Sequence, residues 1–335
     1  MFRVVESYKF LNIIFLGVSV LEADKNSKEW KLIEKTVSQL GVEQRRSRRW
    51  GIFFKLLTFV YLFGLFFLMQ GNFSSNVKHD AEKYTGLVNL RGVIADGEEA
   101  NADFLVSGLR AAFEDKGVQA VILRINSPGG SPVQSGYVFD EIKRLRAIHT
   151  EKPLYAVISD IGASGAYYIA AAADEIYADK ASLVGSIGVV ASGFGFVDTL
   201  EKLGVERRLY TAGEHKGFLD PFSEEKPNEV DFWKGVLNST HDQFISKVKE
   251  GRGDRLKIDE NTFSGLIWNG EQALEMGLID GLGSAGFVAR DIVGAEEIVD
   301  FTPQPDPFER LSKTLGITVA SALAKVLTTS SMSLQ

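Results

Sequence analysis

The feature that most constrains the fold is an alternation of apolar runs and helical patterns after residue 86. Residues 118–125 (VQAVILRI) are almost continuously apolar, which is typical of a strand buried on both faces. Strands that alternate with helices pair in parallel through right-handed βαβ units, so the pattern predicts an α/β fold. The expected strands are residues 87–94, 118–125, 154–158, 176–178 and 183–190, and the expected helices are residues 102–114, 132–149, 165–173 and 229–248, with a helix–strand pair around 273–279.

The composition excludes several classes of function. A net charge of -7 argues against a nucleic-acid partner, which would require a basic face. The chain has no cysteine, so disulfides, thiol catalysis and cysteine-ligated zinc are excluded. The four histidines form no HExxH pattern. We therefore expect neither a metal site nor a cofactor.

A second apolar run precedes the alternating region. Residues 52–69 (IFFKLLTFVYLFGLFFLM) carry one charge, on Lys55, and are long enough to cross a bilayer. Arg45, Arg46, Arg48 and Arg49 precede the run, and positive charge favours the cytoplasmic side. A buried core helix is a weaker explanation because the run is apolar on every face. A cleaved signal peptide is disfavoured by the missing small-x-small site. The sequence thus predicts an uncleaved anchor.

Three glycine-rich loops follow expected strands, at residues 126–130, 162–165 and 185–188. In α/β proteins the loops at the carboxyl ends of parallel strands build the site. Ser164 lies where a strand turns into an alanine-rich helix, so backbone N–H groups there would favour a developing negative charge. The competing interpretation is a helix N-cap, the usual role of serine at this position.

A serine nucleophile requires a base. His215 is the obvious candidate, and Lys216 lies beside it. A lysine can serve if burial lowers its pKa. Both residues could equally be solvated loop charges, and residue chemistry alone does not choose between them.

The chain nevertheless resembles a known family. Residues 124–131 (RINSPGGS), 160–179 (DIGASGAYYIAAAADEIYAD), 185–190 (GSIGVV) and 212–222 (AGEHKGFLDPF) are similar, in this order, to the short bacterial form of the signal peptide peptidase A family. The resemblance implies the Clp-protease/crotonase superfold and a Ser/Lys dyad.

Carried over by motif, the resemblance makes Ser164 the nucleophile and Lys216 the base, with Ser186 orienting the lysine. It assigns the oxyanion N–H groups to Gly165 and to Gly129 or Gly130, and it makes His215 a bystander. The further residues expected to line an apolar substrate groove are Ile187, Val189 and Val190.

The resemblance also implies the substrates, partners and location. Signal peptides and other apolar peptides would be cleaved beside membrane lipid, by a ring-like homo-oligomer such as an octamer. The expected setting is the bacterial inner membrane, crossed once, with the protease domain on the periplasmic or extracellular side. The predicted segments are a cytoplasmic segment (1–50), the anchor (51–70), a linker (71–85), the protease domain (86–303) and a C-terminal amphipathic tail (304–335).

Two other functions remain open. A crotonase-type acyl-CoA enzyme would share the superfold, but such enzymes normally use carboxylates and fit a membrane anchor poorly. A catalytically inactive membrane scaffold is the other alternative, and the Ser164/Lys216 pair argues against it.

Overall fold

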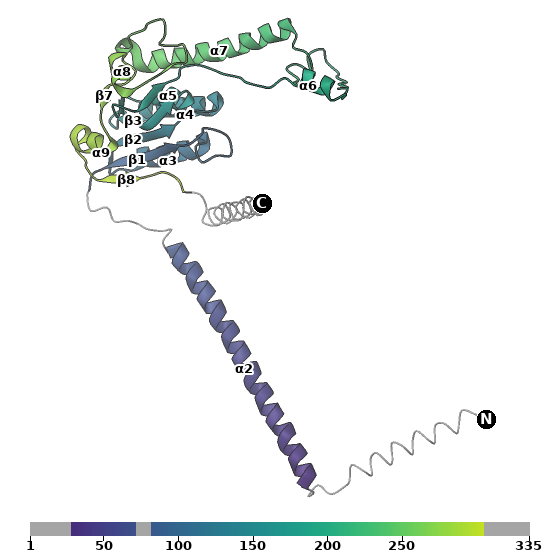
Figure 1. The fold of residues 1–335 in the computed structure, drawn as a ribbon. Helices are drawn as coiled ribbons and strands as arrows, with labels where there is room; N and C mark the ends of the chain where they lie inside the picture. Colours follow the sequence, from purple (N-terminus) through teal and green to yellow (C-terminus); the bar gives the residue numbers. More distant parts are fainter. Residues whose placement is uncertain (1–27, 72–81, 305–335) are drawn as a thin grey trace, which may run out of the picture. The chain divides into compact units, whose positions relative to one another are not determined.

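The computed structural model describes residues 28–71 and 82–304, and the chain separates into two compact units, 1–79 and 80–335. In the first unit, helix α2 (Lys28–Gly71) contains the whole predicted anchor (Figure 1). The side chains of Leu65 and residues 67–71 lie outside those described. Among the described residues, no helix is apolar over a sufficient length to span a bilayer. Most of the predicted linker and all but the first residue of the predicted tail lie outside the described ranges.

The second unit is built on an eight-stranded sheet with the order β6-β5-β3-β2-β1-β8, and β4 and β7 branch from β3. Every pairing is parallel except that of β5 with β6. The predicted α/β fold with a mainly parallel sheet is therefore confirmed. The strands are β1 (Tyr84–Arg91), β2 (Val118–Ser127), β3 (Leu154–Ala163), β4 (Glu175–Ala178), β5 (Leu183–Gly185), β6 (Ile267–Trp268), β7 (Gly281–Leu282) and β8 (Ile298–Asp300).

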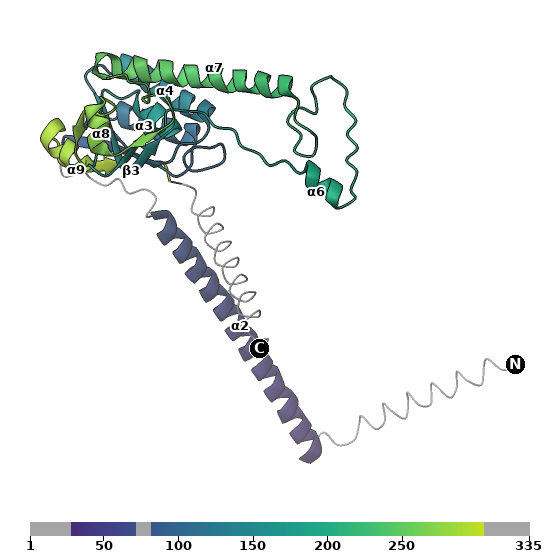
Figure 2. The same cartoon turned by 45° about the horizontal axis from the view of Figure 1, so that its top comes forward.

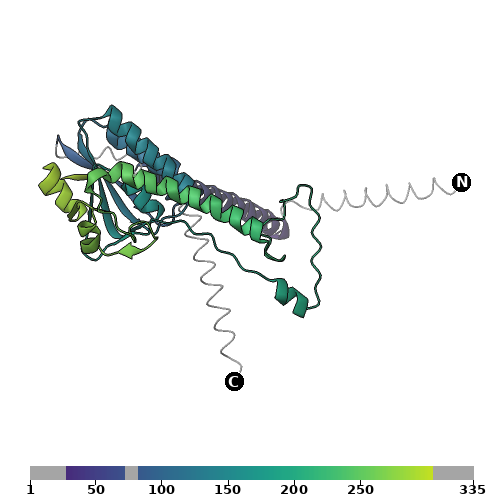
Figure 3. The same ribbon diagram turned by 90° about the horizontal axis from the view of Figure 1, so that it is seen from above.

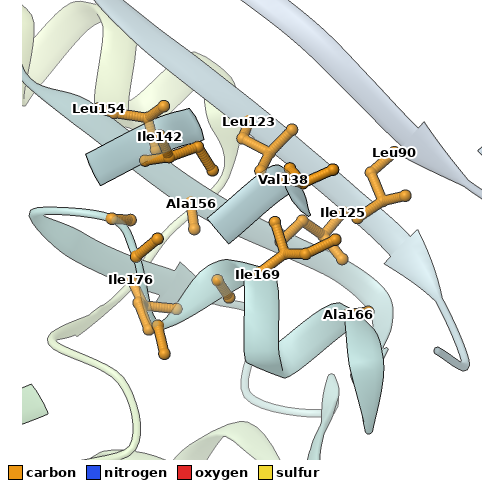
Figure 4. Close-up of a cluster of buried hydrophobic side chains, with 14 of the residues drawn as sticks. Leu90, Leu123, Ile125, Val138, Ile142, Leu154, Ala156, Ala166, Ile169 and Ile176 are labelled. Atoms are coloured by element: carbon orange, nitrogen blue, oxygen red, sulfur yellow. The ribbon is translucent and has the colours of Figure 1, made fainter. Parts of the chain in front are cut away.

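Helices cover both faces of this sheet. The larger core packs β2 against α4 and α5, through side chains such as Leu123, Ile142 and Ile169 (Figure 4). A smaller core packs Ile122 on the opposite face of β2 against Val288 of η2. Burial on both faces explains the continuous apolar run of β2. The helices are α3 (Ala102–Glu114), α4 (Pro132–Ile148), α5 (Gly165–Ala170), α6 (Val197–Lys202), α7 (Pro227–Arg252), α8 (Gly270–Glu275) and α9 (Ala285–Phe287), with short η1 (Gly253–Arg255) and η2 (Val288–Val293).

Two element boundaries differ from the prediction in ways that matter for the site. Strand β3 continues to Ala163, so the expected turn before Ser164 is extended backbone paired with β5. The strand expected over residues 183–190 ends at Gly185, because Gly185 and Ser186 have φ angles of +108° and +52°. Such left-handed conformations end a strand, and they turn the following residues toward α7.

The segment before α7 extends away from the sheet. We call residues 191–226 the arm, and its short helix α6 lies far from the sheet in every view (Figures 1, 2 and 3). Large apolar side chains of the arm are exposed, among them Phe194 at 81% and Tyr210 at 89%. Apolar surface of this extent is typical of a surface that binds a partner.

Candidate active site

Ser164 occupies a strained junction between β3 and α5. Its φ and ψ are +54° and -124°, a conformation that non-glycine residues rarely adopt and that concentrates at functional sites. Its N–H donates to the carbonyl of Gly185 at 2.8 Å. Its side chain makes no capping hydrogen bond with α5, although it precedes the first helical residue. The N-cap interpretation therefore fails, and the hydroxyl is left for another role.

The Pro-Gly-Gly turn lies directly against this serine. A methyl group added to Gly129 would lie 2.8 Å from the Cβ of Ser164. The turn is held by the N–H of Gly129, which donates to Ser127 Oγ at 3.1 Å, and by the N–H of Ile94, which donates to the Gly129 carbonyl at 2.9 Å. Gly129 and Gly130 have φ angles of +96° and +151°, which explains why glycine occupies both positions.

The backbone nitrogens of Gly130 and Gly165 lie close together beside Ser164. A methyl group on Gly165 would lie 3.3 Å from the nitrogen of Gly130, so the two residues are close neighbours. Within residues 82–304, neither the N–H of Gly130 nor that of Gly165 has a hydrogen-bond acceptor. The N–H of Gly165 is one of the first-turn amides of α5, which have no partner in the helix. This pair can stabilise an oxyanion formed at Ser164.

Ser164 opens onto a cavity of about 460 Å³. Besides Ser164 and Gly165, four residues predicted to belong to the site line this cavity: Gly130, Ser186, Val189 and Val190. Residues of α7 line it as well. No lysine, histidine, aspartate or glutamate is among its described lining residues. The lining residues are Gly130, Pro132, Ser164, Gly165, Tyr168, Ser186, Gly188, Val189, Val190, Thr240, Gln243, Phe244, Ser264 and Gly265.

Ile187 is a correction to the predicted groove. Its side chain is fully buried in the main core, whereas Val189 and Val190 line the cavity. Ser186 and Gly188, on either side of Ile187, also line the cavity, so within this segment Ile187 alone turns into the core.

Lys216 lies elsewhere. It is an exposed residue in a turn of the arm, where its N–H donates to the Gly213 carbonyl at 3.2 Å, and it does not line the Ser164 cavity. Beside it, His215 Nδ1 lies 3.6 Å from a carboxylate oxygen of Glu229, which also accepts from Lys226 Nζ at 3.1 Å. One chain therefore brings Ser164 together with the backbone N–H groups of Gly130 and Gly165, but not with Lys216.

Sequence reasoning missed the second wall of the cavity. Thr240, Gln243 and Phe244 come from α7, and Phe244 packs on Tyr168 with 5.0 Å between ring centres. Burial raises the pKa of the Tyr168 hydroxyl above its usual value. A long helix with no catalytic pattern gave no signal that it would face a loop more than 70 residues earlier in the chain.

The mainly parallel α/β sheet fits the ClpP/crotonase-like class of fold. The family model "Peptidase family S49" matches residues 146–292. A putative protease of Synechocystis is 32% identical over 208 residues, which cover 62% of this chain and 72% of that protein. The chain therefore belongs to peptidase family S49.

Other relatives refine the comparison. The putative signal peptide peptidase SppA of Enterococcus faecium is 32% identical over 224 residues, which cover 64% of each chain. A protein of Brucella melitensis named as an Na⁺/H⁺ antiporter is 50% identical over 175 residues, but these cover only 24% of it. That name describes a protein of which this chain matches only a quarter, so the name assigns no transport activity to this chain.

Proposed function

We propose that the chain is a serine endopeptidase in which Ser164 is the nucleophile and Lys216 the general base. The observation that carries the proposal is the strained, uncapped Ser164 beside the unpaired N–H groups of Gly130 and Gly165. Lys216 would take the proton of Ser164 Oγ as that oxygen bonds to the peptide carbonyl carbon. The same proton would pass to the leaving amine when the C–N bond breaks, and Lys216 would then activate water to release the acyl group.

In this proposal the base comes from a neighbouring copy in a ring-like homo-oligomer. The Ser164 cavity has no basic side chain among its described lining residues. A lysine acts as a base when burial favours its neutral form, and Lys216 is exposed in a single chain. Docking of the exposed arm on a neighbour would supply both the burial and the contact with Ser186, the expected orienting residue.

The substrates that fit best are extended apolar peptides, including cleaved signal peptides. Val189, Val190, Tyr168 and Phe244 give the cavity an apolar wall. The name of the Enterococcus relative points to the same substrate class. The described lining holds no carboxylate, which weighs against a crotonase-type acyl-CoA enzyme.

We further propose that residues 51–70 anchor the protein in the bacterial inner membrane, beside lipid, with the peptidase domain outside the cytoplasm. The support is the arginine cluster before the apolar run and the exposure of its side chains on α2, such as Phe59 at 68%. Protease added to spheroplasts should digest the domain. Digestion only after lysis would contradict this orientation.

A fluorophosphonate probe tests the nucleophile. It should label the wild-type protein on Ser164, and the Ser164→Ala variant should be neither labelled nor active on an apolar peptide. A wild-type protein that assembles but is not labelled would favour the inactive scaffold. Labelling that persists in Ser164→Ala would assign the nucleophile to another residue.

Mixed assembly tests the origin of the base. Ser164→Ala and Lys216→Ala subunits should each be inactive alone, and co-assembly should restore part of the activity because one subunit supplies the serine and its neighbour the lysine. A mixture of Ser164→Ala with the double variant is the matched control. No restoration from subunits that do co-assemble would place the base in the same chain as the serine.

A further inference from the structure

The cavity wall formed by residues 186–190 has no regular secondary structure. It is fixed at one side by the N–H of Ser186, which donates to the Leu266 carbonyl at 2.7 Å. A methyl group on Gly188 would lie 3.0 Å from the Cα of Gly265, so the two backbones are in close contact there. Both contacts lie on the side of the wall that faces β6. They do not fix the side that faces α7.

On that side, a histidine joins the wall to the helix. His241 of α7 is partly buried, and its Nε2 lies 3.0 Å from the carbonyl oxygen of Ile187. Since a carbonyl only accepts, Nε2 carries the proton and donates it. Within the described residues this is the only side-chain hydrogen bond to segment 186–190. Its neighbours Thr240 and Gln243 line the cavity, so one turn of α7 both forms a wall and holds the opposite one.

That turn of α7 is itself firmly held. Phe244 and Val248 are buried in the main core, and further along Arg252 is 1% exposed and pairs with Asp280 at 2.7 Å. A methyl group on Gly251 would collide with the Ala171 carbonyl, so α7 lies against the end of α5. His241 therefore connects an anchored helix to a wall that has no regular structure of its own.

We propose that His241 is a positioning residue that sets the width of the substrate cleft by holding the carbonyl of Ile187. This inference rests on the proposed peptidase function. His241 is not among the residues that line the cavity, and its Nε2 is committed to a carbonyl, so it takes no part in proton transfer. It acts through Ser186, Val189 and Val190, which line the cavity. Without it, a partly buried carbonyl loses its partner and the wall shifts.

The test compares His241→Leu, which removes the donor, with His241→Gln, whose amide nitrogen can reach the same carbonyl but is not basic. Asp242→Asn is the matched control, because Asp242 is the next, exposed residue of α7. We expect His241→Leu to raise KM for a long apolar peptide about three- to tenfold, as for a lost hydrogen bond, with a smaller change in kcat. Fluorophosphonate labelling of Ser164 should persist, since a small probe does not span the cleft. His241→Gln should restore most of the KM.

The possible outcomes are distinct. If His241→Leu has the KM of Asp242→Asn, the positioning role is wrong. If both His241→Gln and His241→Leu lose labelling and turnover together, His241 is a base and the proposal is overturned. If His241→Leu does not fold, His241→Asn replaces it: its shorter amide should fall below His241→Gln in affinity, and equal KM values would contradict the proposal. Failure of the proposed function would show separately, as peptide turnover that survives in Ser164→Ala.

Discussion

The wall around Ser164 and the arm that carries Lys216 differ in how the single chain holds them. Ser164 lies at the end of a central strand, with its N–H bonded to Gly185 and its Cβ against Gly129. The arm has one short helix, and the arm's ion pair between Arg207 and Asp220 is long, at 3.4 Å. One chain thus holds Ser164 in a fixed place beside the N–H groups of Gly130 and Gly165, whereas Lys216, the proposed base, stays exposed on the arm.

The largest loss of activity should come from removing either Ser164 or Lys216, the proposed catalytic residue of each region. Ser164→Ala and Lys216→Ala should each lower kcat for an apolar peptide by at least about a thousandfold, because each removes a partner of the dyad. Both proteins should still fold and assemble, as judged by circular dichroism and size-exclusion chromatography. An active Lys216→Ala variant together with an inactive His215→Ala variant would show that the dyad assignment is wrong.

Gly130→Ala should cause the next largest loss of activity, because it displaces a backbone N–H group that lies beside Ser164. The new methyl group would collide with the Ile94 carbonyl, and the φ angle of +151° is strained for alanine. Displacing this N–H should cost about a hundredfold in kcat, as for other oxyanion donors. Fluorophosphonate labelling should slow with it. An equal loss from Gly193→Ala, whose methyl group meets nothing within 4 Å, would remove the contrast between cavity and arm.

Ion pairs on the helices that cover the sheet should contribute more to the free energy of unfolding than ion pairs in the arm. The hydrogen bond from Arg144, with that from Arg110, lowers the pKa of Glu141 to about 2 against the opposing effect of burial. Because the folded pKa is below the usual value near 4.5, the stabilisation is present above that value and is lost as pH falls toward 2. Much of the network is solvated, so we expect Glu141→Gln to cost about 1 kcal/mol at pH 7 and less than half of that at pH 3, where the folded-state carboxyl is still mostly ionised.

Urea unfolding at the two pH values measures this difference. The matched control is Glu206→Gln in the arm, where both partners of the Arg208–Glu206 pair are largely exposed, at 68% and 72%. That variant should unfold like the wild type. A larger loss from Glu206→Gln than from Glu141→Gln would contradict the idea that the arm adds little to the stability of one chain.

His215→Ala should have the smallest effect on activity. Its side chain is 62% exposed, and it lies 3.6 Å from Glu229, which keeps Lys226 as a partner. We expect kcat/KM to change by no more than about threefold, as for the loss of one contact made by an exposed side chain. A steady-state assay beside Lys216→Ala checks this, and a much larger loss would mean that His215 fixes the turn that carries the lysine.

Local patterns of the sequence were sufficient to predict the main helices and strands. The apolar run in β2 and the helical spacing in α4 depend on neighbours in the chain, and both elements form where they were expected. The glycines at 129 and 130 were also readable, since a left-handed turn needs glycine whatever surrounds it.

Only the tertiary structure decided the rest. Position alone favoured a capping role for Ser164, but in the structure this residue has a positive φ and makes no side-chain capping bond, at the point where β3, still paired with β5, meets α5. Ile187 is apolar like its neighbours, and its burial follows from how the segment packs under α7. His241 carries no local signal, because the carbonyl it holds is 54 residues away in the chain. The sequence specifies the chemistry of each side chain, but the direction and partners of that side chain depend on contacts between distant segments.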